Sequence, residues 1–230
     1  FEKKDYDKAE KEFKFCNKKN EQLYEDLIMY ARFLENFDIT QKMDPKQEKN
    51  FLVALQGMIM TIISLDTLYD KLLEYVSDES KTYKKKIGIP VVLNMYENIP
   101  FWWTFFDELG YQVIYSDRSS KKLYELGQNS IPSDTACYPA KLAHGHMENL
   151  LKKDIDYIFY PNMPFNFIEK EHRDNEYNCP VVAFYPEVIG GNMDNLNIES
   201  FYMPYVTLNN KKAFINNLKQ AFNGHLPNKK

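Results

Sequence analysis

The chain has 230 residues, of which 44% are hydrophobic and 15% aromatic, so it can bury the core of one large or two modest domains. Its formal net charge is −4 and charges of both signs are interspersed, which excludes the basic face that nucleic-acid binding needs. The three cysteines, Cys16, Cys137 and Cys179, are an odd number and widely spaced, and no secretory pattern opens the sequence. We therefore expect a cytoplasmic protein in a reducing compartment rather than a disulfide scaffold.

Residues 1–80 are predicted to form an α-helical segment of two long helices. The first 37 residues contain no Gly or Pro, and apolar residues recur at helical intervals from Leu23 onward. A second helix is predicted at about 45–76, and its apolar middle predicts burial against a partner. Its most apolar window, 51–65, is shorter than the ~20 residues of a membrane span, so we expect no membrane partner. Because the chain opens on Phe1 rather than Met, we expect it to be part of a longer protein.

From about residue 86 to 225 the pattern changes to that of an α/β domain. Short apolar runs typical of buried strands alternate with amphipathic helices. The strands are predicted at 87–93, 111–116, 156–161, 180–186 and 200–206, and the helices at 100–110, 119–127, 138–153 and 208–222. This alternation favours a three-layer, mostly parallel sheet of the Rossmann or flavodoxin-like kind. The aromatic side chains of the first of these helices are predicted to be core: Phe101, Trp102, Phe105 and Phe106.

Open α/β sheets bind ligands in the crevice beyond the carboxyl ends of their strands. Polar residues in and after the predicted strand ends are therefore candidates for binding a substrate: Asn94, Tyr96, Ser116, Asp117, Ser133 and Asp134. Catalytic residues are not identifiable, because the sequence contains no dinucleotide, P-loop, nucleophile-elbow or zinc-protease motif and no carboxylate pair suited to acid–base work. Gly190 and Gly191 follow a predicted strand but lead into no helix, which disfavours a phosphate site there.

The stretch IPSDTACYPAKLAHGH, residues 131–146, concentrates a cysteine and two histidines. His144 and His146 are two apart, about 200° around a helix, so they cannot share a metal ion. We expect one of them on the surface and the other packed or capping. Cys137 lies seven residues before His144, roughly 10 Å along a helix, which disfavours a thiolate–imidazole pair. Cluster ligand, nucleophile and small residue at a helix mouth all stay open for Cys137.

Four stretches of the chain resemble one known family: KIGIPVVLNMYENIPFWWTFFDELGYQVIYSDRSSKKLYELG, IPSDTACYPAKLAHGHMENLL, DYIFYPNMPFNF and NEYNCPVVAFYPEVI. The family is the uncharacterised domain of large bacterial proteins related to 2-hydroxyacyl-CoA dehydratase activases, also called CoA-substrate-specific enzyme activases. The resemblance runs from about Lys86 to Phe222. It implies similarity to subunits of 2-hydroxyacyl-CoA dehydratases and of double-cubane-cluster proteins, and a place beside activase-like ATPase modules, which this chain itself does not contain.

The resemblance also implies a metal site, because the related subunits hold a [4Fe–4S] cluster with three cysteines. The matching positions are Cys137 in CYPAK, Asn162 in YPNMP and Cys179 in NCP. Asn162 is the departure, since an amide is a poor ligand for iron in a sulfide cluster. A strand at 180–186 would also place Cys179 at the sheet edge opposite Asn162, on the order of 15 Å away.

Two functions therefore remain open. The first is a dehydratase- or activase-related domain of anaerobic metabolism, whose [4Fe–4S] cluster transfers low-potential electrons toward an acyl-CoA or another small substrate. The second is a non-catalytic interaction domain that keeps the fold and has lost the cluster. The expected partners are activase-like modules of the same longer protein, or a second copy in a homodimer. A helical adapter whose function lies in residues 1–80 is a third possibility.

Overall fold

The structure is a computed structural model that describes residues 73–75, 80–165 and 177–222. Most of the predicted two-helix segment lies outside these ranges, as does Cys16. Within them, no helix is long and apolar enough to span a membrane. Leu73 and Tyr75, near the predicted end of the second helix, pack against a small apolar cluster around Val91 and Ile99. This part of the helical segment therefore contacts the α/β domain.

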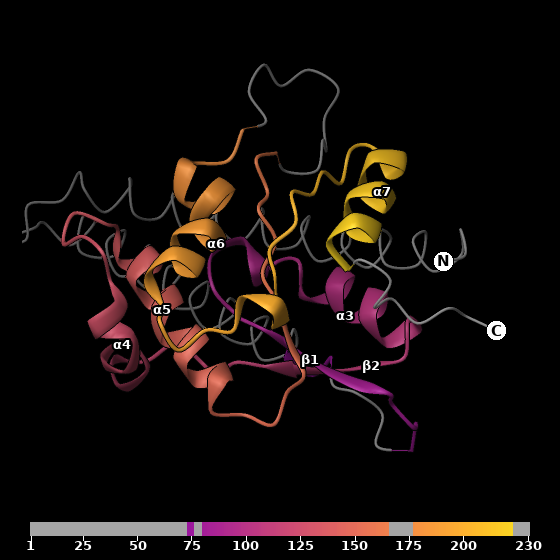
Figure 1. The fold of residues 1–230 in the computed structure, drawn as a ribbon, viewed down its shortest axis with the longest axis horizontal. Coiled ribbons are helices and arrows are strands. Elements are labelled where there is room, and N and C mark those ends of the chain that lie inside the picture. Colours follow the sequence, from indigo (N-terminus) through magenta and orange to yellow (C-terminus); the bar gives the residue numbers. More distant parts are fainter. Residues whose placement is uncertain (1–72, 76–79, 166–176, 223–230) are drawn as a thin grey trace, which may run out of the picture.

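The centre of the domain is a parallel sheet (Figure 1). Its described strands are β1 (Lys85–Ile89), β2 (Tyr111–Tyr115), β3 (Tyr157–Phe159) and β4 (Phe201–Tyr202). The strand order is β2-β1-β3-β4, and all pairs are parallel. Because the order reverses at β1, the topological switch point lies between the carboxyl ends of β1 and β3.

Helices cover both faces of the sheet and make the predicted three layers (Figure 1). On one side lie α3 (Ile99–Glu108) and α7 (Lys211–Phe222), and on the other α4 (Lys121–Gly127), α5 (Tyr138–Leu151) and α6 (Pro180–Asn192). The short 3₁₀ turns are η1 (Leu93–Met95), η2 (Gln128–Ser130) and η3 (Ile198–Ser200). The three-layer α/β fold expected from the sequence is confirmed.

The aromatic residues of α3 form the core that the sequence predicts. Trp102 is fully buried, and its ring lies 4.6 Å from that of Phe159 in β3 and 5.9 Å from that of Phe214 in α7. Phe106 makes equivalent contacts with Phe159 and with Phe222 at the end of α7. These edge-to-face and stacked pairs join one helical layer to the sheet.

The predicted strand at 180–186 is wrong, because these residues open helix α6. Val181, Val182 and Phe184 have strand-like side chains, and this local preference suggested a strand. The buried residues of the segment form pairs three or four apart, as on one helix face: Ala183 with Pro186, Pro186 with Ile189, and Tyr185 with Ile189. Gly190 and Gly191 accordingly lie in the last turn of a helix rather than after a strand.

Two glycines allow α4 and α5 to pack with their backbones in contact. A Cβ atom on Gly145 would lie 2.0 Å from the carbonyl oxygen of Leu123, and one on Gly127 would lie 2.2 Å from the nitrogen of Gly145. No side chain fits at such a distance. The glycine of the HGH motif is thus required for helix packing, and it fixes the positions of the histidines on either side of it.

Candidate functional site

The two described cysteines occupy equivalent places at the carboxyl edge of the sheet. Cys137 is the N-cap of α5 and Cys179 the N-cap of α6, with nearly identical extended backbone angles, and a proline follows each in the first helical turn. Both are exposed and free. The expectation that Cys179 lies at the opposite sheet edge is therefore wrong, because it was based on the strand at 180–186. Helices that return along a parallel sheet begin near the strands' carboxyl ends.

Asn162, the third position of the resemblance, is fully buried and hydrogen-bonded into the sheet. It extends the pairing of β3 by a parallel bridge to Tyr205. Its N–H donates to the carbonyl of Pro204 at 2.8 Å, and its carbonyl accepts from the N–H of Val206 at 2.9 Å. The side-chain Nδ2 donates to the carbonyl of Met203 at 2.8 Å, whereas the side-chain Oδ1 is buried without a partner.

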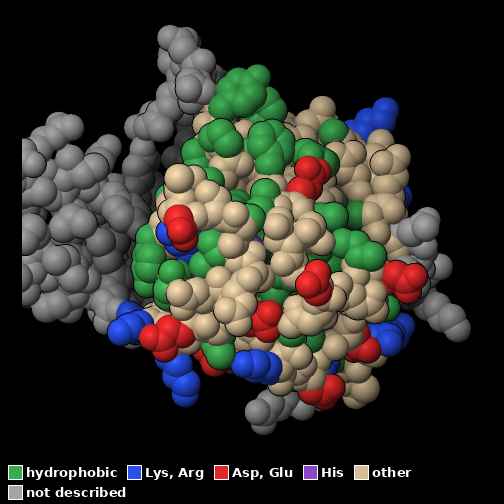
Figure 2. Space-filling model, turned by 60° about the vertical axis from the view of Figure 1, so that its left-hand side comes forward, with side chains coloured by type: hydrophobic (Ala, Val, Ile, Leu, Met, Phe, Trp, Pro, Cys, Tyr) green, Lys and Arg blue, Asp and Glu red, His purple; other side chains and the backbone are tan. Residues whose placement is uncertain are grey.

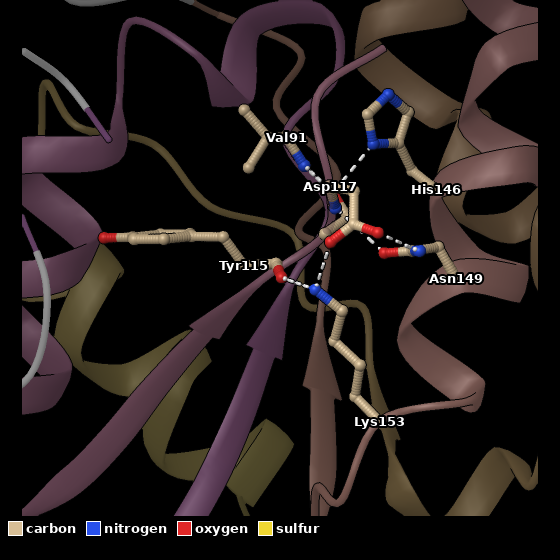
Figure 3. Close-up of polar contacts among 7 residues, drawn as sticks. Val91, Tyr115, Asp117, His146, Asn149 and Lys153 are labelled. Atoms are coloured by element: carbon tan, nitrogen blue, oxygen red, sulfur yellow. Dashed lines mark hydrogen bonds and ion pairs between the residues drawn. The ribbon is translucent and has the colours of Figure 1, made fainter. Parts of the chain in front are cut away.

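A polar network fills the carboxyl end of β2 (Figure 3). Ser116 is buried, its Oγ accepts from the N–H of Val91 at 2.8 Å, and it lies 2.7 Å from Nδ1 of His146. Nε2 of His146 lies 2.9 Å from Oγ of Ser119, which in turn lies 2.8 Å from the hydroxyl of Tyr96. Ser116 and His146 are deeply buried, whereas Ser119 and Tyr96 lie nearer the surface.

The hydrogen positions in this network follow from its geometry. In the described part of the chain, Nδ1 of His146 is the acceptor available to the Ser116 hydroxyl, so Ser116 donates to it. The imidazole then carries its proton on Nε2 and donates to Ser119. Burial lowers the pKa of His146 to about 4, which keeps the ring neutral. His146 is thus bonded through both ring nitrogens, to Ser116 and to Ser119, inside the protein.

Asp117, at the same end of β2, is fixed by Asn149 of α5 and by Lys153, which lies just past the end of that helix (Figure 3). Its N–H donates to Oδ1 of Asn149 and its Oδ2 accepts from Nδ2 of Asn149, both at 2.8 Å. Nζ of Lys153 donates to Oδ1 of Asp117 at 2.6 Å and to the carbonyl of Tyr115 at 2.7 Å. The hydrogen bond from Lys153, followed by that from Asn149, lowers the pKa of the Asp117 carboxyl. This pairing ties a strand end to the helix side of the sheet and gives both carboxylate oxygens of Asp117 a partner within the protein.

His144 belongs to a separate network that joins α5 to α6. Oγ of Ser130 donates to the carbonyl of Gly127, so it accepts from Nδ1–H of His144 at 2.8 Å. Nε2 of His144 consequently accepts from the hydroxyl of Tyr185 at 3.1 Å. Burial lowers the pKa of His144 to about 4 and raises the pKa of Tyr185, with a smaller contribution from the charge of Cys137. The phenol of Tyr185 therefore lies in the neighbourhood of the Cys137 thiol.

Both histidines are fully buried, so the expectation of one surface histidine is wrong. Each ring is satisfied on both nitrogens within the protein, which a solvent-exposed position does not require. Their partners lie in different networks, as the helical spacing of two residues predicts. The two imidazoles also carry their protons on different nitrogens, Nδ1 in His144 and Nε2 in His146.

The structure brings only part of the predicted crevice set together. Asn94, Tyr96, Ser116 and Asp117 lie at the carboxyl ends of β1 and β2, where Nδ2 of Asn94 contacts Sδ of Met163 at 3.1 Å. Ser133 and Asp134 instead lie in the exposed turn before Cys137. Oγ of Ser133 bonds the hydroxyl of Thr135, and the Asp134 carbonyl accepts from Lys141.

Sequence reasoning missed the residues in and just after α5 that hold the β2 end. His146 and Asn149 are three residues apart in α5, Lys153 follows two residues after the helix ends, and all three bond Ser116 or Asp117. That spacing, beside a predicted strand end rich in Ser and Asp, was the available signal. Tyr185 could not have been found, because its segment was predicted as a strand.

The donor set at the carboxyl edge is two thiols and one amide. Across the described ranges, no three or more His, Cys, Asp or Glu side chains come together in a way that could hold a metal ion. Low-potential clusters take three or four thiolates, and the Nδ2 of Asn162 is already committed to Met203. The residues present therefore do not fit a [4Fe–4S] cluster.

Comparison with known proteins identifies a family. The model of the CoA enzyme activase uncharacterised domain family matches residues 86–229. This range starts within β1 and covers the rest of the sheet and every helix from α3 to α7. No curated protein and no solved structure matches the chain.

Proposed function

The chain belongs to the CoA enzyme activase uncharacterised domain family, and we propose that it is a non-catalytic interaction domain of a longer activase-related protein. In this proposal the domain keeps the family fold and has lost the [4Fe–4S] cluster. Asn162 carries the proposal: the position expected to supply the third thiolate holds a buried amide that is bonded into the sheet. An amide oxygen does not replace a thiolate on iron–sulfur iron.

The surface around the two cysteines supports an interaction role. Three exposed aromatic side chains lie beside the cysteines or on the helix that Cys179 caps: Tyr138, Tyr177 and Phe184. The exposed ring of Tyr205 lies 6.3 Å from that of Phe184. Figure 2 shows apolar side chains gathered at the top of the face in view and charged side chains mainly around its lower rim. Exposed aromatic groups with few charges between them are typical of protein interfaces. The proposed partners are the activase-like modules of the same longer protein.

A cluster-bearing domain is the second candidate, and the shared position of the cysteines favours it. Cys137 and Cys179 cap neighbouring helices at one sheet edge, as two ligands of one group would. A bound [4Fe–4S] cluster would supply low-potential electron transfer, in keeping with anaerobic metabolism. The remaining ligands would then have to come from outside the described residues or from another chain.

Iron and acid-labile sulfide analysis after anaerobic purification separates the two candidates. The wild-type chain is compared with Asn162→Cys, and with Asn162→Cys carrying Cys137→Ser as the matched control. We expect no stoichiometric iron or sulfide in the wild type. Iron and sulfide in Asn162→Cys, lost again in the control, would show that the three positions converge while the natural chain is cluster-free. Stoichiometric iron and sulfide in the wild type would overturn the proposal in favour of the cluster.

The interaction role needs its own measurement. Binding of the separately produced activase-like modules is measured by calorimetry with the wild-type chain and with Phe184→Ser. We expect the substitution to weaken binding about tenfold or more, as for an aromatic interface residue. The matched control is Ile198→Ser, an exposed apolar residue of η3 outside the aromatic group. Equal affinity of all three proteins, or no binding by any of them, would contradict this role.

A further inference from the structure

Asn162 does more at the sheet edge than occupy a ligand position. Beyond β3 and β4 the two chain segments continue side by side, and the bonds between them come mostly from this residue. Tyr160 contributes one, from its N–H to the carbonyl of Tyr202 at 2.9 Å. Asn162 contributes three, to Pro204, Val206 and Met203. The segment 203–206 thus depends on a single buried side chain and its backbone for its attachment to the central strand.

The backbone hydrogen bonds between the two segments do not include the Met203 carbonyl, which is bonded by the Asn162 side chain. The ladder uses the carbonyl of Pro204 and the N–H of Val206, while Pro204 itself has no N–H to donate. The Met203 carbonyl receives its hydrogen from Nδ2 of Asn162. A cysteine at this position would have only a weak S–H donor on a shorter side chain.

We propose that Asn162 is an internal clamp that holds segment 203–206 to β3 through its amide N–H, so that this edge of the domain folds without any metal ion. In a metal-dependent domain, binding energy at the ligand positions is folding energy, and removing the metal unfolds the site. In this chain the corresponding energy comes from hydrogen bonds inside a fully buried site. The inference rests on the proposed function in one respect: it assumes that no [4Fe–4S] cluster is bound beside Asn162.

The two ends of the Asn162 amide make the clamp testable. Nδ2 is bonded and Oδ1 is buried without a partner, so the bond that holds segment 203–206 is the one that Nδ2 donates, and Oδ1 contributes none. Asn162→Asp keeps the shape but replaces the donor with a second acceptor oxygen and adds a negative charge, which would face the Met203 carbonyl in a buried site. Protonation of the new carboxyl restores an O–H that can donate to Met203. The stability deficit of the variant relative to the wild type at the same pH should therefore shrink as the pH falls, because a buried carboxyl has a raised pKa.

Urea unfolding of the full chain at pH 7 and pH 5, with and without a chelator, tests the clamp. The matched control is Asn217→Asp, since Nδ2 of Asn217 in α7 donates to the carbonyl of Tyr205 at 2.8 Å in an exposed setting. We expect Asn162→Asp to lower the folding equilibrium constant about tenfold or more relative to the wild type at pH 7. At pH 5 this ratio to the wild type should be smaller, and that decrease is the recovery the test looks for. Asn217→Asp should change the folding equilibrium constant less than about threefold, with no such recovery. The chelator should leave the wild type unchanged.

Three results would overturn the clamp: equal effects of the two Asp variants at pH 7, no recovery of Asn162→Asp at pH 5, or a chelator effect on the wild type as large as the substitution. If Asn162→Asp does not fold at pH 7, Asn162→Ala gives the same comparison without a charge, and its loss should not depend on pH. Iron released by the chelator from a wild-type chain that stays equally stable would refute the cluster-free function and leave the clamp standing.

Discussion

The carboxyl ends of β2 and β3 lie at the same edge of one sheet but differ in how their polar groups are used. At β2, Ser116, Asp117 and their partners from α5 satisfy one another, and two imidazole nitrogens and a lysine take part. At β3, Asn162 is buried and bonded to segment 203–206, whereas the two cysteines expose their thiols. Saturated buried networks stabilise a fold, whereas open groups are available to partners. The difference indicates that α5 stabilises the β2 end, and the proposed interaction is assigned to the edge with the exposed thiols.

The largest expected effect comes from breaking the helix contact on which both histidine networks depend. Gly145→Ala would place a Cβ 2.0 Å from the Leu123 carbonyl, so α4 and α5 would have to separate. We expect a loss of more than about 4 kcal/mol in the free energy of unfolding, or no folded protein. Gly191→Ala, where no atom lies within 4 Å of the new Cβ, is the control and should change it by less than about 1 kcal/mol. Circular dichroism with urea unfolding measures both, and a stable Gly145→Ala would contradict the packing described for α4 and α5.

Acid should destabilise the domain through the two histidines before it acts on the carboxylates. Their folded pKa values of about 4 lie below the unfolded value of 6.5, so the unfolded chain binds more protons between these limits. Stability is then complete above about pH 6.5 and falls as the pH drops toward 4, by about 3 kcal/mol for each histidine. Urea unfolding across this range, compared with His146→Gln, measures the effect. The variant should lose about half of the pH dependence, and an unchanged slope would refute the neutral, buried assignment of His146.

A smaller effect is expected from the surface-facing part of the β2 network. Lys153→Met removes the ion pair with Asp117 and the hydrogen bond to the Tyr115 carbonyl but keeps the apolar stem. Because the Asp117 side chain is 66% exposed, we expect a loss of only about 1 kcal/mol, which added salt should reduce. The control Lys121→Met breaks only a long, exposed pair with Glu125 and should cost almost nothing. Equal losses in the two variants would show that the contact at Asp117 has no special role.

The smallest effect on stability is expected at the open edge itself. Cys137→Ser and Cys179→Ser should each change the free energy of unfolding by less than about 0.5 kcal/mol, because both side chains are exposed N-caps and serine caps helices well. Both thiols should react with a maleimide in the folded protein, and bound activase-like modules should slow the reaction. Thiols that react only after unfolding would contradict the exposed edge and with it the contrast between β2 and β3.

The sequence by itself determined the class of fold, because alternating apolar runs and amphipathic helices have few other ways to bury their faces. It also predicted the aromatic core of α3 and the helix that begins after Cys137, since Pro139 sits in its first turn. These features depend on residues close together in the chain, where periodicity and capping rules apply.

Only the tertiary structure decided what the polar residues do. Val181 and Val182 favour a strand locally, yet burial of Tyr185 and Ile189 against the core makes the segment a helix. The roles of His144, His146 and Asp117 depend on partners about 14 to 41 residues away, which spacing along one helix does not reveal. Asn162 reads as a lost ligand in the sequence, and only its bonds to segment 203–206 show the clamp. Hydrogen bonds between distant segments form because the fold buries their polar groups together. The order of apolar and polar residues in the sequence predicts which residues are buried, but it does not predict which polar groups bond one another.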